Sequence, residues 1–365
     1  MALASRILRK FRGYILPSHL RTFREVIEAG RSQPGDEKKQ FVFFDFTNPE
    51  IDLDAGRYIF ALVRDFEECG FISCYRRNFP FLSNLRYKRY KSILLERPFR
   101  VCNSLSGLPT GSVAAVVTDR KRSRITGTKI IRVLYDERLP RNEGEVSMPF
   151  PVYPKLYEQL RTLKKIEVER ERPWRCFFAG TVTEKYGRDI LPTRFGKMSR
   201  LGILKTLKSQ LSPTEVFEIE SGAHLPRDGA CVVLAGKSYR VPLEQWFPTL
   251  AQADFFLACP GGSMPLCHNL IEAMAVGTIP ILEYPEYLDP ALRDGVNCLA
   301  FSGAENLIPT ARRALELKPE QIRRMREAVC AYFRHHLAPG LFARWLMKSP
   351  MHEIKILFKT PFVRR

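Results

Sequence analysis

The stretch CPGGSMPLCHNLIEAMAVGTIPILEYPEY, residues 259–287, contains a turn, a helix rich in small residues, a short apolar strand and a loop of aromatic and acidic residues. It follows the apolar run DFFLACP at 254–260, which predicts a strand that ends at the turn. Strand, turn, helix and strand in this order are typical of a parallel sheet with helices on its faces. The stretch therefore predicts an α/β fold, with the turn at the carboxyl end of a strand.

The second half of the chain continues this alternation on both sides of the stretch. WRCFFAGT (174–181), ACVVLAG (230–236) and TIPILEY (278–284) have the apolar content of buried strands. KMSRLGILKTLKSQL (197–211) has the length of a helix. We expect these segments to form one Rossmann-like domain.

The first half shows the same alternation of predicted strands and helices. QFVFFDF (40–46), SVAAVVTD (112–119) and KIIRVLYD (129–136) predict buried strands. The segment AGRYIFALVRDFEECGF at 55–71 has apolar residues at helical spacing, and Gly70 suits the end of that helix. A second Rossmann-like domain follows from this pattern.

The predicted organisation is α/β, with two Rossmann-like domains facing each other across a cleft where ligands meet the carboxyl ends of strands. A segment rich in Pro and charge separates the two halves, and we expect a charged helix within it. The predicted parts are basic leader helices (1–37), an N-terminal Rossmann-like domain (38–150), a linker (151–171), a C-terminal Rossmann-like domain (172–330), and C-terminal helices with a basic tail that can cross back to the first domain (331–365).

Composition limits the possible functions. The 365 residues are 45% hydrophobic, which is enough for two cores and argues against disorder as the main state. No run of about 18 uncharged apolar residues occurs, and charges interrupt the N-terminus too closely for a signal peptide. Nine cysteines without metal-type spacing predict reduced thiols in the cytoplasm and no disulfides.

The net charge of +19 predicts an anionic partner, which could be a nucleic acid, an anionic lipid or a phosphorylated substrate. The first and last basic clusters are interleaved with apolar residues, a pattern that suits peripheral binding to an anionic membrane face. A solvated charged face would explain any single cluster equally well.

The opening stretch suits a phosphate-bearing ligand. Gly261, Gly262 and Ser263 form a turn in which glycines let a ligand approach the backbone. Pro265 suits the first position of a helix, and the free N–H groups and positive end of a helix favour phosphate. His268 and Glu272 lie four residues apart and should share one helix face.

A carboxylate at Glu272 can accept two hydroxyl protons, as a ribose presents them. For Glu272 alone, an exposed helix position would be the simpler interpretation. Together with the glycine turn, the pattern predicts a nucleotide-sugar pocket, in which Glu272→Ala removes donor binding and leaves the fold intact.

The segment EAMAVGTIPIL resembles the donor-binding domain of two-domain GT-B glycosyltransferases, in which a glutamate holds the ribose of the nucleotide sugar. FFLACPGG and HNLIEAMAVGTIPIL together are most similar to the exostosin-like glycosyltransferases, and RPWRCFFAGT resembles the strand that opens their donor domain. The resemblance covers residues 172–300, and more weakly 41–71. It implies that Glu272 is the ribose-binding glutamate.

Three positions depart from these patterns. Met264 stands where many retaining members carry a second glutamate, and Cys267 and Asn269 stand where the exostosin-like pattern often has a serine and an arginine. Retention or inversion of the sugar configuration therefore stays open, and the phosphate contacts must come from elsewhere.

Candidate phosphate contacts are the cations between the strand at 174–181 and the next helix. We expect Arg194 and Arg200 to stabilise the departing nucleoside diphosphate without a metal, although each could be an ordinary surface arginine. Glu283 and Tyr284, which follow the next strand, are candidate residues for sugar specificity. No cofactor is expected, because the nucleotide sugar is a co-substrate.

A base for an inverting reaction should come from the first domain. Asp45 ends the first strand and is our candidate, although a turn or cap position would explain it as well. The DLD motif at 52–54 has the form of a metal site, but we interpret Asp54 as a helix cap and expect no metal. His224 and His268 are further candidates for the base, although a lone histidine is more often structural. The histidine pair at 335–336 lacks partner ligands at metal spacing.

These observations predict a metal-independent glycosyltransferase acting in cell-envelope polysaccharide or lipopolysaccharide synthesis. Its acceptor would be an anionic glycan or lipid-linked glycan, and the enzyme would be cytoplasmic, peripheral on the inner membrane face. The alternative is a non-catalytic, basic nucleic-acid-binding α/β protein, which is disfavoured because no nucleic-acid module is recognisable.

Overall fold

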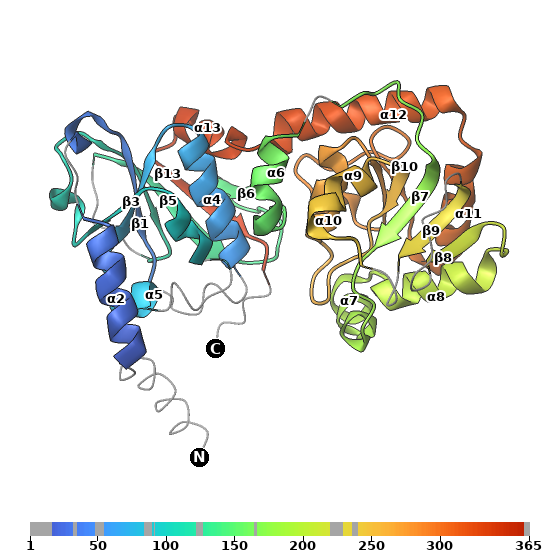
Figure 1. Cartoon of the computed structure of the whole chain (residues 1–365), viewed down its shortest axis with the longest axis horizontal. Coiled ribbons are helices and arrows are strands. Elements are labelled where there is room, and N and C mark those ends of the chain that lie inside the picture. The colour runs from blue at the N-terminus through green and yellow to red at the C-terminus, as the bar shows by residue number, and fades with distance from the viewer. Residues whose placement is uncertain are drawn as a thin grey trace, which may run out of the picture. The chain divides into compact units, whose positions relative to one another are not determined.

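The computed structural model describes residues 17–31, 35–47, 55–83, 90, 92–121, 127–163, 166–219, 229–235 and 240–360. The chain forms two compact units, residues 1–148 with 339–365 (unit 1) and residues 149–338 (unit 2) (Figure 1). Each unit contains one parallel sheet with helices packed on it. The expected fold class, α/β with two Rossmann-like domains, is confirmed.

Unit 1 has a seven-stranded sheet with the order β3-β2-β1-β4-β5-β13-β6. Its strands are β1 (Phe41–Asp45), β2 (Ile72–Arg76), β3 (Phe99–Cys102), β4 (Val113–Thr118), β5 (Lys129–Tyr135), β6 (Glu145–Ser147) and β13 (Glu353–Phe358). Its α-helices in the described residues are α2 (Pro17–Ala29), α4 (Gly56–Glu68), α5 (Phe79–Ser83) and α13 (Leu341–Lys348).

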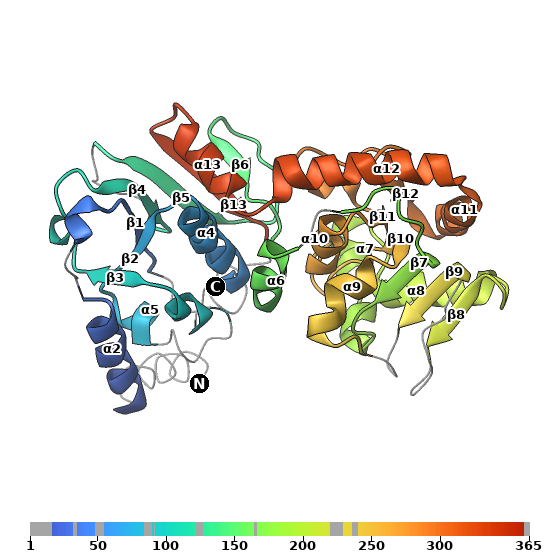
Figure 2. The same ribbon diagram turned by 45° about the horizontal axis from the view of Figure 1, so that its top comes forward.

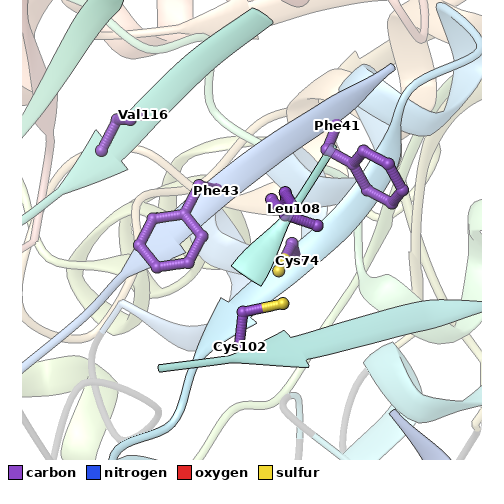
Figure 3. Close-up of a cluster of buried hydrophobic side chains, with 6 residues drawn as sticks. All are labelled: Phe41, Phe43, Cys74, Cys102, Leu108 and Val116. Atoms are coloured by element: carbon purple, nitrogen blue, oxygen red, sulfur yellow. The ribbon is translucent and has the colours of Figure 1, made fainter. Parts of the chain in front are cut away.

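The central strand β1 explains the apolar run in the sequence. All five of its residues are buried, because β2 and β4 flank it and both faces of the sheet are covered. Phe41 and Phe43 point to one face, where they pack in a buried cluster with Cys74, Cys102, Leu108 and Val116 (Figure 3). Phe44 points to the other face and contacts the ring of Phe66 in α4, with ring centroids 6.2 Å apart.

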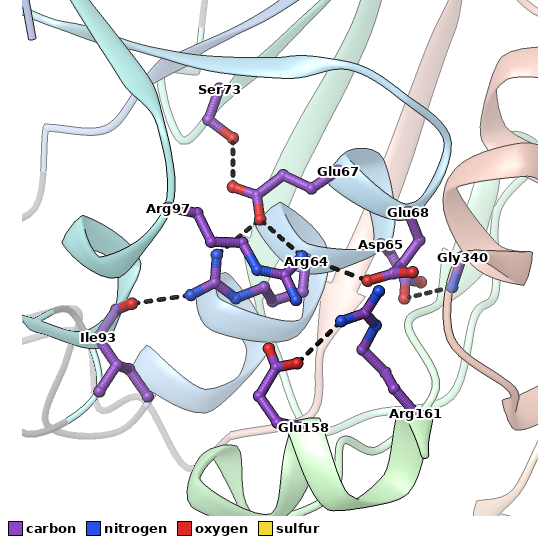
Figure 4. Close-up of polar contacts among 10 residues, drawn as sticks. All are labelled: Arg64, Asp65, Glu67, Glu68, Ser73, Ile93, Arg97, Glu158, Arg161 and Gly340. Carbon is purple, nitrogen blue, oxygen red and sulfur yellow. Dashed lines mark hydrogen bonds and ion pairs between the residues drawn. The ribbon is translucent and has the colours of Figure 1, made fainter.

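Helix α4 is held by polar contacts as well as by its apolar face (Figure 4). The guanidinium of Arg64 donates to Glu67 at 2.6 Å and to the carbonyl of Ile93 at 2.8 Å, and Ser73 donates to the same glutamate at 3.3 Å. These bonds tie the helix to β2 and to the short helix Ser92–Glu96. Gly70 ends the helical segment with φ at 85°, as the sequence predicted.

The C-terminal segment, expected as helices and a basic tail, returns to unit 1 and also contains a strand. Strand β13 lies between β5 and β6 and is parallel to both. Helix α13 packs beside α4, as Figures 1 and 2 show, and Asp65 accepts a hydrogen bond from the backbone N–H of Gly340 at 2.8 Å. Tyr58 stacks on Phe358 with ring centroids 5.0 Å apart. The basic residues 361–365 lie outside the described residues.

Unit 2 has a six-stranded parallel sheet with the order β12-β11-β10-β7-β9-β8. Its strands are β7 (Trp174–Ala179), β8 (Val216–Ile219), β9 (Gly229–Ala235), β10 (Ala253–Leu257), β11 (Ile279–Leu282) and β12 (Leu299–Ala300). Its α-helices in the described residues are α6 (Tyr157–Arg161), α7 (Ile190–Phe195), α8 (Arg200–Gln210), α9 (Trp246–Leu250), α10 (His268–Ala275), α11 (Gly303–Glu316) and α12 (Pro319–Tyr332).

The expected linker differs from the structure. Residues 151–171 belong to unit 2, and their described part has the short 3-10 helix Pro154–Leu156 and the five-residue α-helix α6 where a longer charged helix was predicted. Tyr157 and Leu160 are buried, so the helix extends only as far as its apolar contacts support it. Beyond it, charged residues outnumber apolar residues.

Some predictions fall outside the described residues: most of the basic leader (1–16), the DLD motif at 52–54 and His224. Among the helices that the structure describes, none has the length and apolar character needed to span a bilayer.

Candidate active site

The candidate site of unit 2 lies where the strand order reverses. From β7 the chain continues to β8 and β9 on one side of the sheet, whereas β10, β11 and β12 lie on the other side. In open α/β sheets, ligands bind outside the carboxyl ends of the strands at such a switch point. The loops that follow β7 and β10 therefore define the site, and most of the predicted donor residues lie on them or beside them.

The glycine turn follows β10. The backbone N–H of Gly261 donates to the carbonyl of Pro265 at 3.2 Å, which closes the turn. A Cβ at Gly261 would lie 2.8 Å from the carbonyl oxygen of Met264, and one at Gly262 would lie 3.2 Å from Cε of Lys185. Gly261 is thus required by close packing against backbone atoms, whereas the Lys185 side chain could move away from a Cβ at position 262.

The predicted helix start at Pro265 is wrong. Helix α10 begins at His268, because Pro265 is part of the turn closed by Gly261 and Cys267 is extended, with φ at −136° and ψ at 144°. Ser263 therefore precedes the helix by five residues, and His268 opens it. The first helical turn therefore starts at His268.

Arg200 joins the two loops at the switch point. It is the first residue of α8, where Ser199 caps the helix by accepting a hydrogen bond from the N–H of Gly202 at 3.1 Å. Its guanidinium donates to the carbonyl of Thr181 after β7 at 2.9 Å and to that of Pro260 after β10 at 2.9 and 3.1 Å. The group is 3% exposed. Arg200 thus places a positive charge where the diphosphate was predicted, while its hydrogen bonds brace the loops.

The ring of Tyr186 covers this arginine, with Cζ of Arg200 4.0 Å from the ring centroid. Arg194, the other predicted phosphate contact, lies on α7 and is exposed, with its Cζ 5.7 Å from the ring centroid of Phe195. The structure therefore places Arg200 in the switch-point loops and Arg194 on the neighbouring helix.

Glu272 is buried at the core side of α10. It is 0% exposed, and its Oε1 accepts from the N–H of Tyr153 at 2.8 Å while its Oε2 accepts from Nε1 of Trp246 at 2.6 Å. Nδ1 of His268 lies 2.9 Å from Oε1, so the predicted shared face is confirmed. The carboxylate that was expected to meet a ribose has three protein partners.

Two opposing effects act on the pKa of Glu272. Burial alone would raise it, but the charge of His268 and the hydrogen bonds from His268, Tyr153 and Trp246 outweigh burial and lower the pKa. His268 is the outward-facing member of this group, since 30% of its side chain is exposed. Its ring lies 5.6 Å from that of Tyr153, centroid to centroid.

Glu283 and Tyr284 follow β11 and are both buried. The carboxylate of Glu283 accepts from the backbone N–H groups of Met198 at 2.5 Å and Gly303 at 2.8 Å, and thereby ties β11 to the starts of two helices. The hydroxyl of Tyr284 donates to the carbonyl of Ala258 at 2.9 Å. The structure brings these residues to the same sheet edge, where they hold the loops together.

Asp45, the candidate base, ends β1 in unit 1 and has only 4% of its side chain exposed. Its Oδ2 accepts from Arg76 at 2.9 Å and from Arg120 at 2.8 Å. Its Oδ1 is buried and has no hydrogen-bond partner among the described residues. A base must expose an oxygen to the acceptor hydroxyl, so this geometry favours orientation of the two arginines over proton abstraction.

No family model matches the chain, and no curated protein matches it. Among the similar solved structures is HepE of Anabaena in complex with UDP, with 11% identity and a TM-score of 0.47 over 85% of this chain and 100% of HepE. T4 phage BGT in complex with UDP-glucose has 12% identity and a TM-score of 0.39 over 85% of this chain and 100% of BGT.

AviGT4, a glycosyltransferase involved in avilamycin A biosynthesis, is 14% identical, with a TM-score of 0.40 over 85% of this chain and 99% of AviGT4. These solved structures are glycosyltransferases of the GT-B group. We infer the function from the site and not from these likenesses, whose TM-scores lie below 0.5.

The sequence did not predict several residues of the site. Tyr153, Tyr186 and Trp246 are such residues, and their only local signal is an aromatic side chain beside a short helix or turn. Lys197 donates to the carbonyl of Glu283 and pairs with Glu286, both at 2.8 Å. Within the described ranges, no group of three or more His, Cys, Asp or Glu side chains could hold a metal ion.

Proposed function

We propose that the protein is a glycosyltransferase, which moves a sugar from a nucleotide-sugar donor to a hydroxyl group of an acceptor. The observation that carries this proposal is the convergence of predicted donor residues at the switch point of the unit 2 sheet. Gly261, Arg200, His268 and Glu283 come from three separate segments and lie at or beside the carboxyl ends of β7, β10 and β11.

The chemistry of transfer fits this edge of the sheet. A departing nucleoside diphosphate gains negative charge as the glycosidic bond breaks, and fixed cations and backbone N–H groups stabilise that charge. Arg200 and Lys197 supply positive charge beside the loops that follow β10 and β11. We therefore propose that donor binding and transfer need no metal ion.

Glu272 has a supporting role in this proposal. It can accept a ribose hydroxyl only by giving up a present partner, since the carboxylate is fully buried and bonded at both oxygens. We propose that it holds His268 and the backbone at Tyr153 in place, and that His268 meets the nucleotide at the start of α10. The partly exposed imidazole can form a hydrogen bond with a ribose hydroxyl or a phosphate oxygen.

The finer assignments are proposals that rest on the sequence. The resemblance of residues 172–300 supports an exostosin-like relationship. The net charge of +19 supports an anionic glycan or lipid-linked glycan as acceptor, and work at the cytoplasmic face of an anionic membrane in envelope polysaccharide synthesis. Flotation with vesicles of neutral and anionic lipid at two salt concentrations tests the membrane proposal. Equal flotation with both lipids would contradict it.

A thermal-shift screen of the purified chain against UDP, GDP, CMP, ADP and dTDP, with and without EDTA, tests the proposed function. A ligand that binds only the native state raises the unfolding temperature according to its concentration relative to its Kd. We expect a shift with one nucleotide that EDTA does not change. A shift that EDTA removes would contradict metal independence, and a shift with oligonucleotides alone would favour nucleic-acid binding.

Two histidine variants make the screen specific to the site. His268→Gln should remove most of the nucleotide shift, because the imidazole opens α10 beside the glycine turn. His335→Gln is the matched control, since His335 is an exposed residue of the same unit. Equal loss of the shift in both variants would contradict the placement of the donor site.

A further inference from the structure

Unit 1 has its own switch point, between β1 and β4. From β1 the chain builds β2 and β3 on one side, whereas β4 and β5 lie on the other side. Asp45 is the last residue of β1, Arg76 is the last residue of β2, and Arg120 follows β4 by two residues. Three charged side chains from three neighbouring strands therefore meet at the position where open α/β sheets bind ligands.

The cluster has two positive charges and one negative charge, and its members differ in exposure. The single carboxylate of Asp45 accepts from both guanidinium groups through Oδ2, and it can neutralise only one of them. Its side chain is 4% exposed, whereas those of Arg76 and Arg120 are 40% and 39% exposed. The buried member is negative, and the members that solvent reaches are positive.

The backbone around Arg120 is firmly held. Its N–H donates to Oγ1 of Thr118 at 3.1 Å, and the same hydroxyl donates to the carbonyl of Asp45 at 3.1 Å. The guanidinium of Arg132 donates to the carbonyl of Arg120 and also pairs with Glu353 at 2.8 Å. Arg120 is thus fixed at its backbone and at its side chain before any ligand arrives.

One further carboxylate, Asp119, lies at this edge. Its Oδ1 accepts from the N–H and the hydroxyl of Thr47, both at 2.8 Å, and its Oδ2 accepts from the hydroxyl of Tyr135 at 3.3 Å. Both oxygens of Asp119 therefore accept hydrogen bonds from residues at or near the ends of β1 and β5. Lys121, which follows Arg120 in the chain, is exposed and adds positive charge.

We propose that Arg76 and Arg120 bind an oxyanion of the acceptor substrate, a phosphate or a carboxylate, and that Asp45 is the positioning residue that aims both guanidinium groups. The identification of this ligand as the acceptor substrate rests on the proposed function, whereas the binding of an oxyanion does not. Guanidinium groups match phosphate and carboxylate oxygens through paired, charge-assisted hydrogen bonds. Pre-orientation by a buried carboxylate lowers the entropy that two long side chains lose on binding.

The experiment measures the affinity of the full chain for inorganic phosphate and for glucuronate by titration calorimetry. The variants are Arg76→Gln, Arg120→Gln and Asp45→Asn, with Arg77→Gln as the matched control. Arg77 is exposed, is next to Arg76 in sequence, and lies over the ring of Phe23 with its Cζ 5.8 Å from the centroid. UDP affinity and the unfolding temperature are measured for every variant.

We expect Arg76→Gln and Arg120→Gln each to weaken anion binding about tenfold, through the loss of charge-assisted hydrogen bonds, with Arg77→Gln like wild type. Phosphate binding without glucuronate binding identifies a phosphorylated acceptor, and the converse identifies a uronic acid. Equal weakening in all three arginine variants would overturn the proposal, because it would show only non-specific attraction.

Asp45→Asn separates positioning from simple electrostatics. Removal of a negative charge should strengthen anion binding if only charge matters, whereas loss of the shared ion pair should weaken it if Asp45 aims the arginines. We expect weaker binding, partly restored in Asp45→Glu, with unchanged UDP affinity. Stronger binding in Asp45→Asn would overturn the positioning role. Absence of UDP binding in wild type would instead contradict the proposed function and leave the anion measurement intact.

Discussion

The substitution Glu272→Ala tests how the structure uses its most buried acidic residue. The sequence alone predicted that this variant would lose donor binding and keep its fold. In the structure, the carboxylate satisfies Nε1 of Trp246, the N–H of Tyr153 and Nδ1 of His268. The substitution removes the only carboxylate in the described contacts of these three donors, so we expect it to destabilise unit 2.

The magnitude follows from the groups left behind. Each buried donor without an acceptor costs about 1–3 kcal/mol, and His268 contributes less because water reaches part of its side chain. With the loss of a buried ionic partner, the expected decrease in the free energy of unfolding is about 3–5 kcal/mol. This is about a fifth or more of the total free energy of unfolding, which is about 5–15 kcal/mol for a typical protein.

Urea denaturation followed by tryptophan fluorescence measures this effect, with Trp246 as a reporter beside the substituted residue. Glu327→Ala, at an exposed position of α12, is the control and should change the free energy of unfolding by less than about 0.5 kcal/mol. A Glu272→Ala variant whose free energy of unfolding lies within about 1 kcal/mol of wild type, yet which has lost UDP binding, would refute the structural role. It would instead support the original prediction that Glu272 binds the ribose.

Glu272→Gln adds a pH test. Because the folded protein lowers the pKa of Glu272, this residue stabilises the fold above the ordinary pKa, about 4.3 for glutamic acid, and the contribution is lost as the pH falls through the folded value. Wild type should therefore lose stability in acid more steeply than Glu272→Gln. Parallel acid profiles would contradict the lowered pKa.

Three further predictions concern stability elsewhere. Burial raises the pKa of Asp65 to about 7, so the stability that this residue contributes is fully present below the unfolded value of about 3.9 and is lost as the pH rises through about 7; Asp65→Asn should flatten this part of the pH dependence in urea titrations. Gly261→Ala places a Cβ 2.8 Å from the carbonyl oxygen of Met264 and should cost about 1–3 kcal/mol in urea denaturation. Asp254→Ala leaves the buried guanidinium of Arg326 without its carboxylate and should cost about 3–5 kcal/mol in the same assay. An unchanged pH slope would contradict the first prediction, and unchanged denaturation midpoints the other two.

The central strands could be predicted because burial on both faces leaves an uninterrupted apolar run. β1 and β10 are fully buried and were found from sequence within one to three residues of their bounds. β13 was missed because Glu353 and Lys355 interrupt its apolar residues, and because its partner β5 is more than 200 residues away in the chain. Pairing over that distance leaves no local signal.

The site was predictable only where contacts are local. The four-residue spacing of His268 and Glu272 correctly indicated a shared helix face. Tyr153 lies 119 residues from Glu272 and Trp246 lies 26 residues away, so their donation to the carboxylate depends on tertiary structure. The position of Pro265 was misread because a turn closed by one backbone hydrogen bond and a helix start share the same residue preferences.

The place of β13 in the sheet of unit 1 has a consequence for the order of events on the ribosome. β5 and β6 leave the ribosome early, but the strand that joins them is translated only after the whole of unit 2. At elongation rates of about 5–20 residues per second, the interval is about 10 to 40 seconds. Throughout it, β5 exposes an unpaired backbone edge to neighbouring nascent chains. Unit 2 can complete its sheet during that interval, so the unit that is translated first is the one that finishes last.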